Sequence, residues 1–332
     1  MLPLWYNCVL YPIPYKTTNS YLVLKGEVKD MFTKLINKLQ NDSYITLETT
    51  PTHEPILSNI IDKLTQYNLT NKIDGFTTTD NPLAKLKYNS LFAAIKLQQK
   101  FNLPVIATMS MRDRNKIALQ SDLLGANDFD VRAILALTGD PANMSDQPRT
   151  KGVFEANSNM LLEIITSFNN GMDYSGKLFK HKPKPIYPFS VINSYAKSFK
   201  TLEKKMNKKI HNNSIGIITQ PVYDLQNAKI LLQHFNNAKN NFTDQRKQSE
   251  LIFGIFPITK LRTAQFLSSH VPGIHVPSSW IDALCKAAKI SEEEEYKIGM
   301  QLSKKLFDDI KAFHPKIHLM TANRFDIANE LL

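Results

Sequence analysis

Residues 134–142 read ILALTGDPA, and this stretch indicates how the chain folds. Its first four residues are apolar, and a run this short and apolar is typical of a strand buried on both faces. Thr138, Gly139, Asp140 and Pro141 follow at once, so a flexible glycine and a carboxylate come directly after the buried segment. We therefore expect a parallel strand whose carboxyl end opens onto a polar site.

Strand-length apolar runs of this kind recur along the chain, at residues 44–50, 73–79, 104–110, 133–139, 186–192, 214–221, 251–258 and 273–277. Segments of helical period lie between them, for example at 83–100, 224–237 and 259–269. This alternation predicts an α/β fold, a (β/α)8 TIM barrel in a single domain. A doubly wound open sheet is the rival, but no Gly-x-Gly-x-x-Gly fingerprint follows any of the runs.

The remaining segments are placed around this barrel. Residues 44–332 are expected to form the barrel domain, and residues 1–43 an N-terminal extension. The extension should contain a helix at 27–39, which either plugs the bottom of the barrel or packs on its side. Residues 171–186 are expected to form a long loop on the βα side. Ser291 and Glu294 form a capping box before the last long helix, and Asp80 and Asp113 are expected to cap helices.

The composition narrows the class of protein. The 332 residues carry a formal charge of +11, which alone would suit nucleic acid or a membrane surface. The densest basic stretches, 177–184 and 200–209, are interleaved with other residues, so we expect a solvated surface with one or two lysines on a phosphate-bearing ligand, and no nucleic-acid partner.

Cellular location follows from the cysteines and the apolar runs. The two cysteines, Cys8 and Cys285, have no ligand-type neighbours in sequence, which favours a reducing compartment over a disulfide frame or a metal site. No run approaches the roughly 20 apolar residues that span a bilayer. Residues 1–16 resemble a signal peptide poorly. We expect a cytoplasmic protein with no membrane partner; self-association into a homo-oligomer stays open.

Polar residues cluster where the predicted strands end, and in a barrel these ends build the active site. Glu48 lies within or just past the first strand, with no lysine or arginine nearby in sequence, so a buried carboxyl there could keep its proton near neutral pH and act as a general acid. Asp140 follows the fourth run and Gln220 the sixth. Hydroxyls end the second and third runs. This constellation fits many barrel enzymes.

The ordered set of strand-end motifs is more specific. LETTP (47–51), SMRDRNKIALQSDLLGA (110–126), ILALTGDP (134–141), IITQPVYD (217–224) and HLMTANR (318–324) occur in order. Together with DNPLAKLKYNS (80–90), KGVFEANS (151–158), GIFPITKLRTAQF (254–266) and GIHVP (273–277), they resemble the 5,10-methylenetetrahydrofolate reductase family in its short, bacterial-type form.

That resemblance implies a flavin-dependent barrel enzyme of one-carbon metabolism and methionine biosynthesis. The family reduces methylenetetrahydrofolate to 5-methyltetrahydrofolate by ping-pong hydride transfer through FAD, with NADH or NADPH as the electron source. It implies that Glu48 is the acid that helps to open the folate ring, that Asp140 lies near flavin and folate, and that Gln220 contacts both substrates. By the same resemblance the cofactor residues are Thr79, Thr108, Ser110, Thr138, Gly139, Asp140, Phe154, Lys208 and Lys209. The further substrate residues are Tyr223, Leu261 and Arg324.

The chain departs from the family pattern at three positions. Thr108 stands where the family has a histidine, Asn212-Asn213-Ser214 replaces Ala-Gly-Ala before the sixth run, and Leu261 replaces a phenylalanine. A relative fed by another electron donor or a partner protein, or a folate- or flavin-binding subunit without activity, is therefore the alternative.

Overall fold

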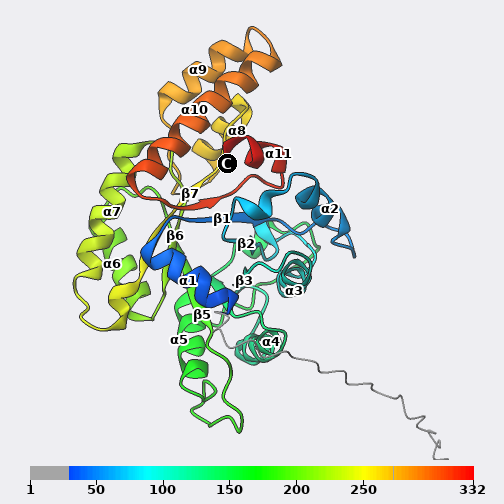
Figure 1. Cartoon of the computed structure of the whole chain (residues 1–332), viewed down its shortest axis with the longest axis vertical. Helices are drawn as coiled ribbons and strands as arrows, with labels where there is room; N and C mark the ends of the chain where they lie inside the picture. Colours follow the sequence, from blue (N-terminus) through cyan, green and yellow to red (C-terminus); the bar gives the residue numbers. More distant parts are fainter. Residues whose placement is uncertain (1–29, 272) are drawn as a thin grey trace, which may run out of the picture.

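The computed structural model describes residues 30–271 and 273–332, and eight parallel strands within these ranges close into a barrel (Figure 1). They are β1 (Tyr44–Thr49), β2 (Gly75–Thr78), β3 (Val105–Ser110), β4 (Ala133–Leu137), β5 (Tyr187–Ile192), β6 (Gly216–Pro221), β7 (Glu250–Ile255) and β8 (Lys316–Leu319). Each strand pairs with the next, and β8 pairs with β1. The predicted barrel is confirmed, while Cys8 and the stretch used for the signal-peptide expectation lie outside the described residues.

Helices surround the strands in Figure 1, and the pair α9 and α10 extends beyond the barrel at the top of the view. The α-helices are α1 (Met31–Asn41), α2 (Ser58–Gln66), α3 (Ser90–Phe101), α4 (Lys116–Asp128), α5 (Ser158–Asn169), α6 (Phe199–His211), α7 (Leu225–Lys239), α8 (Leu261–His270), α9 (Ser278–Ala288), α10 (Glu292–Phe313) and α11 (Phe325–Leu331). Short 3-10 helices are η1 (Leu69–Asn71), η2 (Pro82–Ala84), η3 (Ala142–Met144) and η4 (Gln245–Gln248). Among the described helices, none is long and apolar enough to cross a membrane.

The helix α1 closes the bottom of the barrel. Phe32, Leu35 and Leu39 on α1 are buried in one cluster with the inward-facing residues of the strands, such as Tyr44 and Ile106. The ammonium group of Lys316, at the start of β8, donates a hydrogen bond to the Leu39 carbonyl oxygen. Of the two placements left open by the sequence, the plug is therefore the right one.

The eighth strand was predicted in the wrong place. Residues 273–277 form a loop between α8 and α9, and β8 lies some forty residues further on, at Lys316–Leu319. Gly273 has φ +86° and Pro277 caps α9, so neither residue suits the interior of a strand. The apolar side chains of Ile274 and Val276 are buried nonetheless, in the core between strands and helices. Their burial explains the strand-like pattern.

The predicted helix at 83–100 begins later than expected, at Ser90. Leu83 and Ala84 adopt the left-handed region, with φ of 56° and 57°, which an α-helix does not allow. Asn89 caps α3, because its side-chain oxygen accepts the N–H groups of Leu91 and Phe92. Residues 81–89 are thus a loop at the mouth of the barrel.

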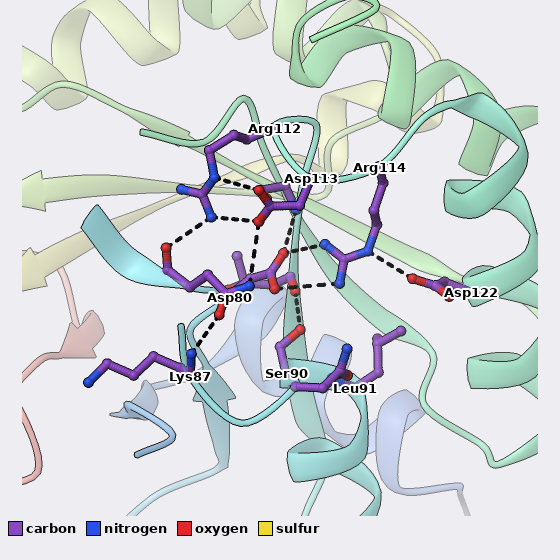
Figure 2. Close-up of polar contacts among 12 residues, drawn as sticks. Asp80, Lys87, Ser90, Leu91, Arg112, Asp113, Arg114 and Asp122 are labelled. Carbon is purple, nitrogen blue, oxygen red and sulfur yellow. Dashed lines mark hydrogen bonds and ion pairs between the residues drawn. The ribbon is translucent and has the colours of Figure 1, made fainter. Parts of the chain in front are cut away.

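A buried ion pair ties the end of β2 to the segment after β3 (Figure 2). Arg114 Nη1 lies 2.6 Å from Asp80 Oδ2, and the two side chains are 9% and 1% exposed. Asp80 Oδ2 also accepts the Ser110 N–H at 2.9 Å, and Arg114 Nε donates to Asp122 at 2.8 Å. The expectation that Asp80 caps a helix is therefore wrong, since this carboxylate neutralises a buried guanidinium.

The prediction that Asp113 caps a helix is also wrong, because this carboxylate too is paired with an arginine. Arg112 is buried and forms two hydrogen bonds with the carboxylate of Asp113, at 2.7 and 2.6 Å (Figure 2). Its Nη2 also donates to the Asn81 carbonyl oxygen at 3.0 Å, which anchors the loop after β2. The residue that caps α4 is Asn115.

Two smaller expectations were also tested. Ser291 caps α10, since its hydroxyl accepts the Glu294 N–H, but the Ser291 N–H donates to the Ala287 carbonyl oxygen, so only this half of the predicted capping box is formed. Residues 171–186 connect α5 to β5, so this loop lies at the amino ends of the strands and not on the βα side as expected. Its basic side chains are therefore remote from the mouth.

We predict that Arg114→Met lowers the free energy of unfolding by about 3–5 kcal/mol, because it leaves the carboxylate of Asp80 buried without its partner. Urea denaturation measures this change. Arg246→Met is the matched control, since its pair with Asp244 is more exposed and should contribute much less to stability. Adding Asp80→Asn to Arg114→Met should restore part of the loss. An Arg114→Met variant no less stable than the control would refute the role of the pair.

Candidate active site

A cavity of about 670 Å³ opens at the carboxyl ends of the strands. Ten of the sequence-predicted site residues contribute to its lining: Glu48, Thr79, Thr108, Ser110, Thr138, Gly139, Asp140, Lys208, Lys209 and Gln220. They come from β1, from the ends of β2, β3, β4 and β6, and from α6. The fold therefore brings together most of the residues that were proposed from strand ends far apart in sequence.

Glu48 projects into the cavity from β1, where it pairs with Thr77 of β2. Its side chain is 22% exposed, so the carboxyl is half-buried with a path to the cavity. Its nearest ionisable partner is a histidine of β8: His318 Nε2 lies 3.7 Å from Glu48 Oε2. The carboxyl can thus receive a proton on one side and face a ligand on the other.

Asp140 stands at the mouth, directly after β4. Its Oδ2 accepts the N–H of Leu83 at 2.6 Å, which joins the loops after β2 and β4. The preceding Gly139 has φ +93°, and a Cβ there would lie 2.9 Å from Arg112 Cβ and 3.2 Å from Ser110 Cβ. Glycine is therefore required for both conformation and space, and it fixes where the chain turns to present Asp140.

Gln220 is aimed by an irregularity in the sheet. The register between β6 and β7 shifts between Ile218 and Pro221, and the Thr219 hydroxyl accepts the Gly254 N–H at 2.9 Å. Such a bulge re-aims the side chains beside it. On the outer side, a Cβ at Gly273 would lie 2.6 Å from Gln220 Oε1, so the loop after α8 packs closely on this amide.

Three lysines of α6, namely Lys205, Lys208 and Lys209, line one end of the cavity. Lys209 is buried, and its Nζ donates to Ser158 Oγ at 2.6 Å. The Ser158 N–H in turn donates to Thr138 Oγ1 at 3.2 Å. Burial, together with the charge of Lys208, lowers the pKa of Lys209 to about 8. This end of the cavity is suited to an anionic group.

The hydroxyl side chains at the ends of β2 and β3 form another part of the lining. Thr79 Oγ1 and Ser110 Oγ are buried and have no hydrogen-bond partner within the described part of the chain. Because an unsatisfied buried hydroxyl is costly, such groups indicate a polar ligand between the strands. Thr108 is also buried beside them, and its carbonyl oxygen accepts the Ser90 hydroxyl at 2.7 Å.

Four predicted site residues lie outside the cavity lining. Tyr223 is buried and donates its hydroxyl to the Phe256 carbonyl oxygen at 3.1 Å. Leu261 starts α8, and Arg324 precedes α11 and pairs with Asp326 at 2.6 Å. Phe154 is 36% exposed in the loop before α5. Leu261 and Arg324 follow β7 and β8, so both are at the mouth end of the barrel.

Residues 212–214, where the chain departs from the Ala-Gly-Ala pattern, connect α6 to β6. Asn212 ends α6 and Asn213 adopts a left-handed conformation with φ 60°. The Ser214 hydroxyl lies 2.8 Å from the Ser190 hydroxyl, inside the fold. The helix therefore ends two residues after Lys209, whose ammonium group lies at the cavity.

Sequence reasoning missed His318, Asn193 and Lys205, which also line the cavity. His318 was missed because the eighth strand was placed at 273–277. A usable signal was present: residues 316–320 read KIHLM, in which polar and apolar residues alternate as in a strand with one polar face. Among the described residues, no cluster of His, Cys, Asp or Glu side chains could hold a metal ion.

Solved structures with a similar fold include a protein from Clostridium thermocellum that binds two copies of 5-methyl-5,6,7,8-tetrahydrofolic acid. It aligns with a TM-score of 0.59 and 14% identity over 91% of this chain and 97% of that one. DmoA from Hyphomicrobium sulfonivorans aligns with a TM-score of 0.50 and 8% identity over 87% and 85% of the two chains. At these identities the likeness concerns the fold. No curated protein sequence matches the chain.

The sequence itself matches the methylenetetrahydrofolate reductase family over residues 32–332, which include the whole barrel and all residues lining the cavity. The chain therefore belongs to the methylenetetrahydrofolate reductase family.

Proposed function

We propose that this protein reduces 5,10-methylenetetrahydrofolate to 5-methyltetrahydrofolate with FAD as its cofactor and NAD(P)H as the electron source. The observation that carries the proposal is the meeting of Glu48, Asp140 and Gln220 in one cavity, from three different parts of the barrel. Family membership supports the folate substrate, and a protein of similar fold binds a reduced folate.

The cavity residues suit FAD. Lys205, Lys208 and Lys209 would hold its phosphates, and the buried hydroxyls of Thr79 and Ser110 would meet polar atoms of the flavin. Bound FAD would supply the hydride chemistry between the nicotinamide and the folate. The residues of the chain bind and orient the reactants and supply the proton.

Glu48 is the proposed proton donor. The five-membered ring of the folate must open before it can accept a hydride, and protonation of a ring nitrogen makes the C–N bond easier to break. The electron pair of that bond stays on the protonated nitrogen, and the remaining carbon becomes part of a 5-iminium cation. A half-buried carboxyl that faces the cavity can deliver this proton directly or through one water molecule.

Asp140 and Gln220 act on the substrate in different ways. The negative charge of Asp140 stabilises the iminium cation electrostatically at the mouth of the cavity. Gln220 both donates and accepts hydrogen bonds, which matches the mixed donor and acceptor edge of a pterin. Leu261 and Arg324 would contact the part of the folate that extends beyond the cavity, while Tyr223 and Phe154 would support the surrounding loops.

The first test is the visible spectrum of the purified protein. Bound oxidised FAD should bleach under anaerobic conditions when NADH or NADPH is added and recover when methylenetetrahydrofolate follows. Protein that is colourless, takes up no added FAD and oxidises no nicotinamide would contradict the proposal, and would favour the alternative of a binding subunit.

Glu48→Gln should separate the two half-reactions. We predict that nicotinamide-dependent bleaching stays within about twofold of the wild type, while reoxidation by the folate slows by at least ~10²-fold, since the proton donor is lost. Stopped-flow absorbance of the flavin measures both rates. Glu54→Gln, at an exposed position after β1, is the matched control and should change neither rate. Equal loss of both half-reactions would refute the assigned role of Glu48.

Binding of FAD should be linked to protonation of Lys209. A phosphate near its ammonium group favours the charged form, so binding takes up a proton, and FAD affinity should fall by up to about tenfold per pH unit above pH 8. In the protein without FAD, folding stability changes with pH in the opposite direction to the FAD affinity. Because the pKa of Lys209 is lower than its unfolded value, burial of the charged form costs stability below pH 8, and stability should rise between pH 8 and 10.

Fluorescence titration with FAD at several pH values measures this linkage. Lys209→Gln should weaken binding and remove the pH dependence in this range. Lys205→Gln, at an exposed position on the same helix, is the control and should weaken binding while the pH dependence remains. A pH dependence that survives in Lys209→Gln would rule out this lysine as its source.

A further inference from the structure

A histidine inside the barrel contacts the proposed proton donor. His318 lies on β8, pairs with Thr46 of β1 and with Gly254 of β7, and its side chain is 3% exposed. It lines the same cavity as Glu48, and its Nε2 is 3.7 Å from Glu48 Oε2. A small movement of either side chain would bring these atoms into hydrogen-bond distance.

The other ring nitrogen of His318 is held from β1. Thr46 Oγ1 lies 3.0 Å from His318 Nδ1, and Thr46 is fully buried. A hydroxyl can either donate or accept, so Thr46 can hold the imidazole in each of its protonation states. The ring is thereby fixed with its second nitrogen directed towards the carboxyl of Glu48.

Other charges around this pair have partners of their own. Below it on β8, Lys316 lies 3.2 Å from Glu250 of β7, and on β1 the next inward residue is Tyr44, whose pKa is raised by burial. The remaining ionisable groups in the cavity lining are Asp80, Asp140, Lys205, Lys208 and Lys209. Of these, Asp80 is paired with Arg114 and Lys209 is bonded to Ser158. Glu48 is therefore the carboxylate placed to share a proton with His318.

We infer that His318 and Glu48 hold one proton between them, and that His318 keeps the proton donor supplied at neutral pH while Thr46 positions the imidazole. This inference rests on the proposed function. The pair is neutral overall whether the proton is on the carboxyl or on the imidazole. When Glu48 gives the proton to the folate nitrogen, the pair is left with one negative charge and regains a proton from water through the cavity. No electrons are exchanged in this step.

A shared proton has a measurable consequence for pH dependence. An isolated glutamate side chain loses its proton near pH 4.3 and an isolated imidazole near 6.5, whereas two interacting groups titrate as a unit. In the FAD-loaded protein, His318→Gln should slow reoxidation by the folate at least about tenfold at pH 7 and move the fall of this rate to lower pH by roughly one to two units. Bleaching by the nicotinamide should stay within about twofold.

Thr46 supplies a second test that leaves both ionisable groups in place. Thr46→Val removes the hydroxyl at nearly constant volume and should move the pH profile in the same direction as His318→Gln, but by less. Thr46→Ser keeps the hydroxyl and should restore the profile. If His318→Gln and Thr46→Val lower the rate equally at every pH, the histidine has only a structural role and the inference is wrong.

NMR titration of the imidazole groups tests the coupling without any activity. Glu48→Gln should move the pH dependence of the His318 ring resonances to lower pH, because the carboxylate stabilises the charged imidazole. His314, half-buried near the barrel bottom with Nε2 bonded to the Leu251 carbonyl oxygen, is the internal control and should not change. An unchanged His318 midpoint would overturn the inference. A coupled titration in a protein whose flavin is not reoxidised by the folate would instead contradict the proposed function.

Discussion

Closure of the barrel by the pairing of β8 with β1 is the constraint on which the rest of the structure depends. The pairing joins residues 44–47 to 316–319, at opposite ends of the described chain, and leaves no strand with an open edge. It is reinforced below by the Tyr44 N–H, which donates to the Pro315 carbonyl oxygen at 2.8 Å, and by α1. Because all strands are parallel, closure also collects their carboxyl ends at one mouth. The site therefore exists only when the first and last strands meet.

The side chains inside the barrel change from apolar at the bottom to polar at the mouth. Near α1 it is filled by Phe32, Leu35 and Tyr44, which pack as an ordinary apolar core. One layer higher, Thr46 and His318 bring polar atoms into contact, and above them Glu48 reaches the cavity. This follows from strand geometry, since alternate residues of one strand face the same side. Residues 44, 46 and 48 of β1 thus lead from a dry core to the reactive surface.

The sequence predicted what depends on local pattern. The run before Thr138 reads as a buried strand, and its continuation into Gly139 and Asp140 indicated the mouth, because parallel buried strands are apolar throughout and change composition abruptly where they end. Prediction from the sequence failed where the role of a residue depends on partners distant in the chain. Asp80 resembles a helix cap in sequence, and only folding brings Arg114 to it. The strand at 316–319 carries an inward lysine and histidine, so its pattern is weaker than that of 273–277, whose apolar residues are buried by helices. His318 was lost with that strand.

Under the proposed function, the charges of the cavity suit a ligand that is anionic at one end and becomes cationic at the other. The lysines of α6 make one end basic, while Glu48 and Asp140 lie at the ends of β1 and β4. The third strand contributes only the small hydroxyl side chains of Thr108 and Ser110. On this arrangement the imidazole beside the proton donor comes from β8, inside the barrel and out of direct contact with solvent. Under the proposed function, a proton held there reaches the substrate through Glu48, so the chemistry of the mouth depends on the strand pair that closes the fold.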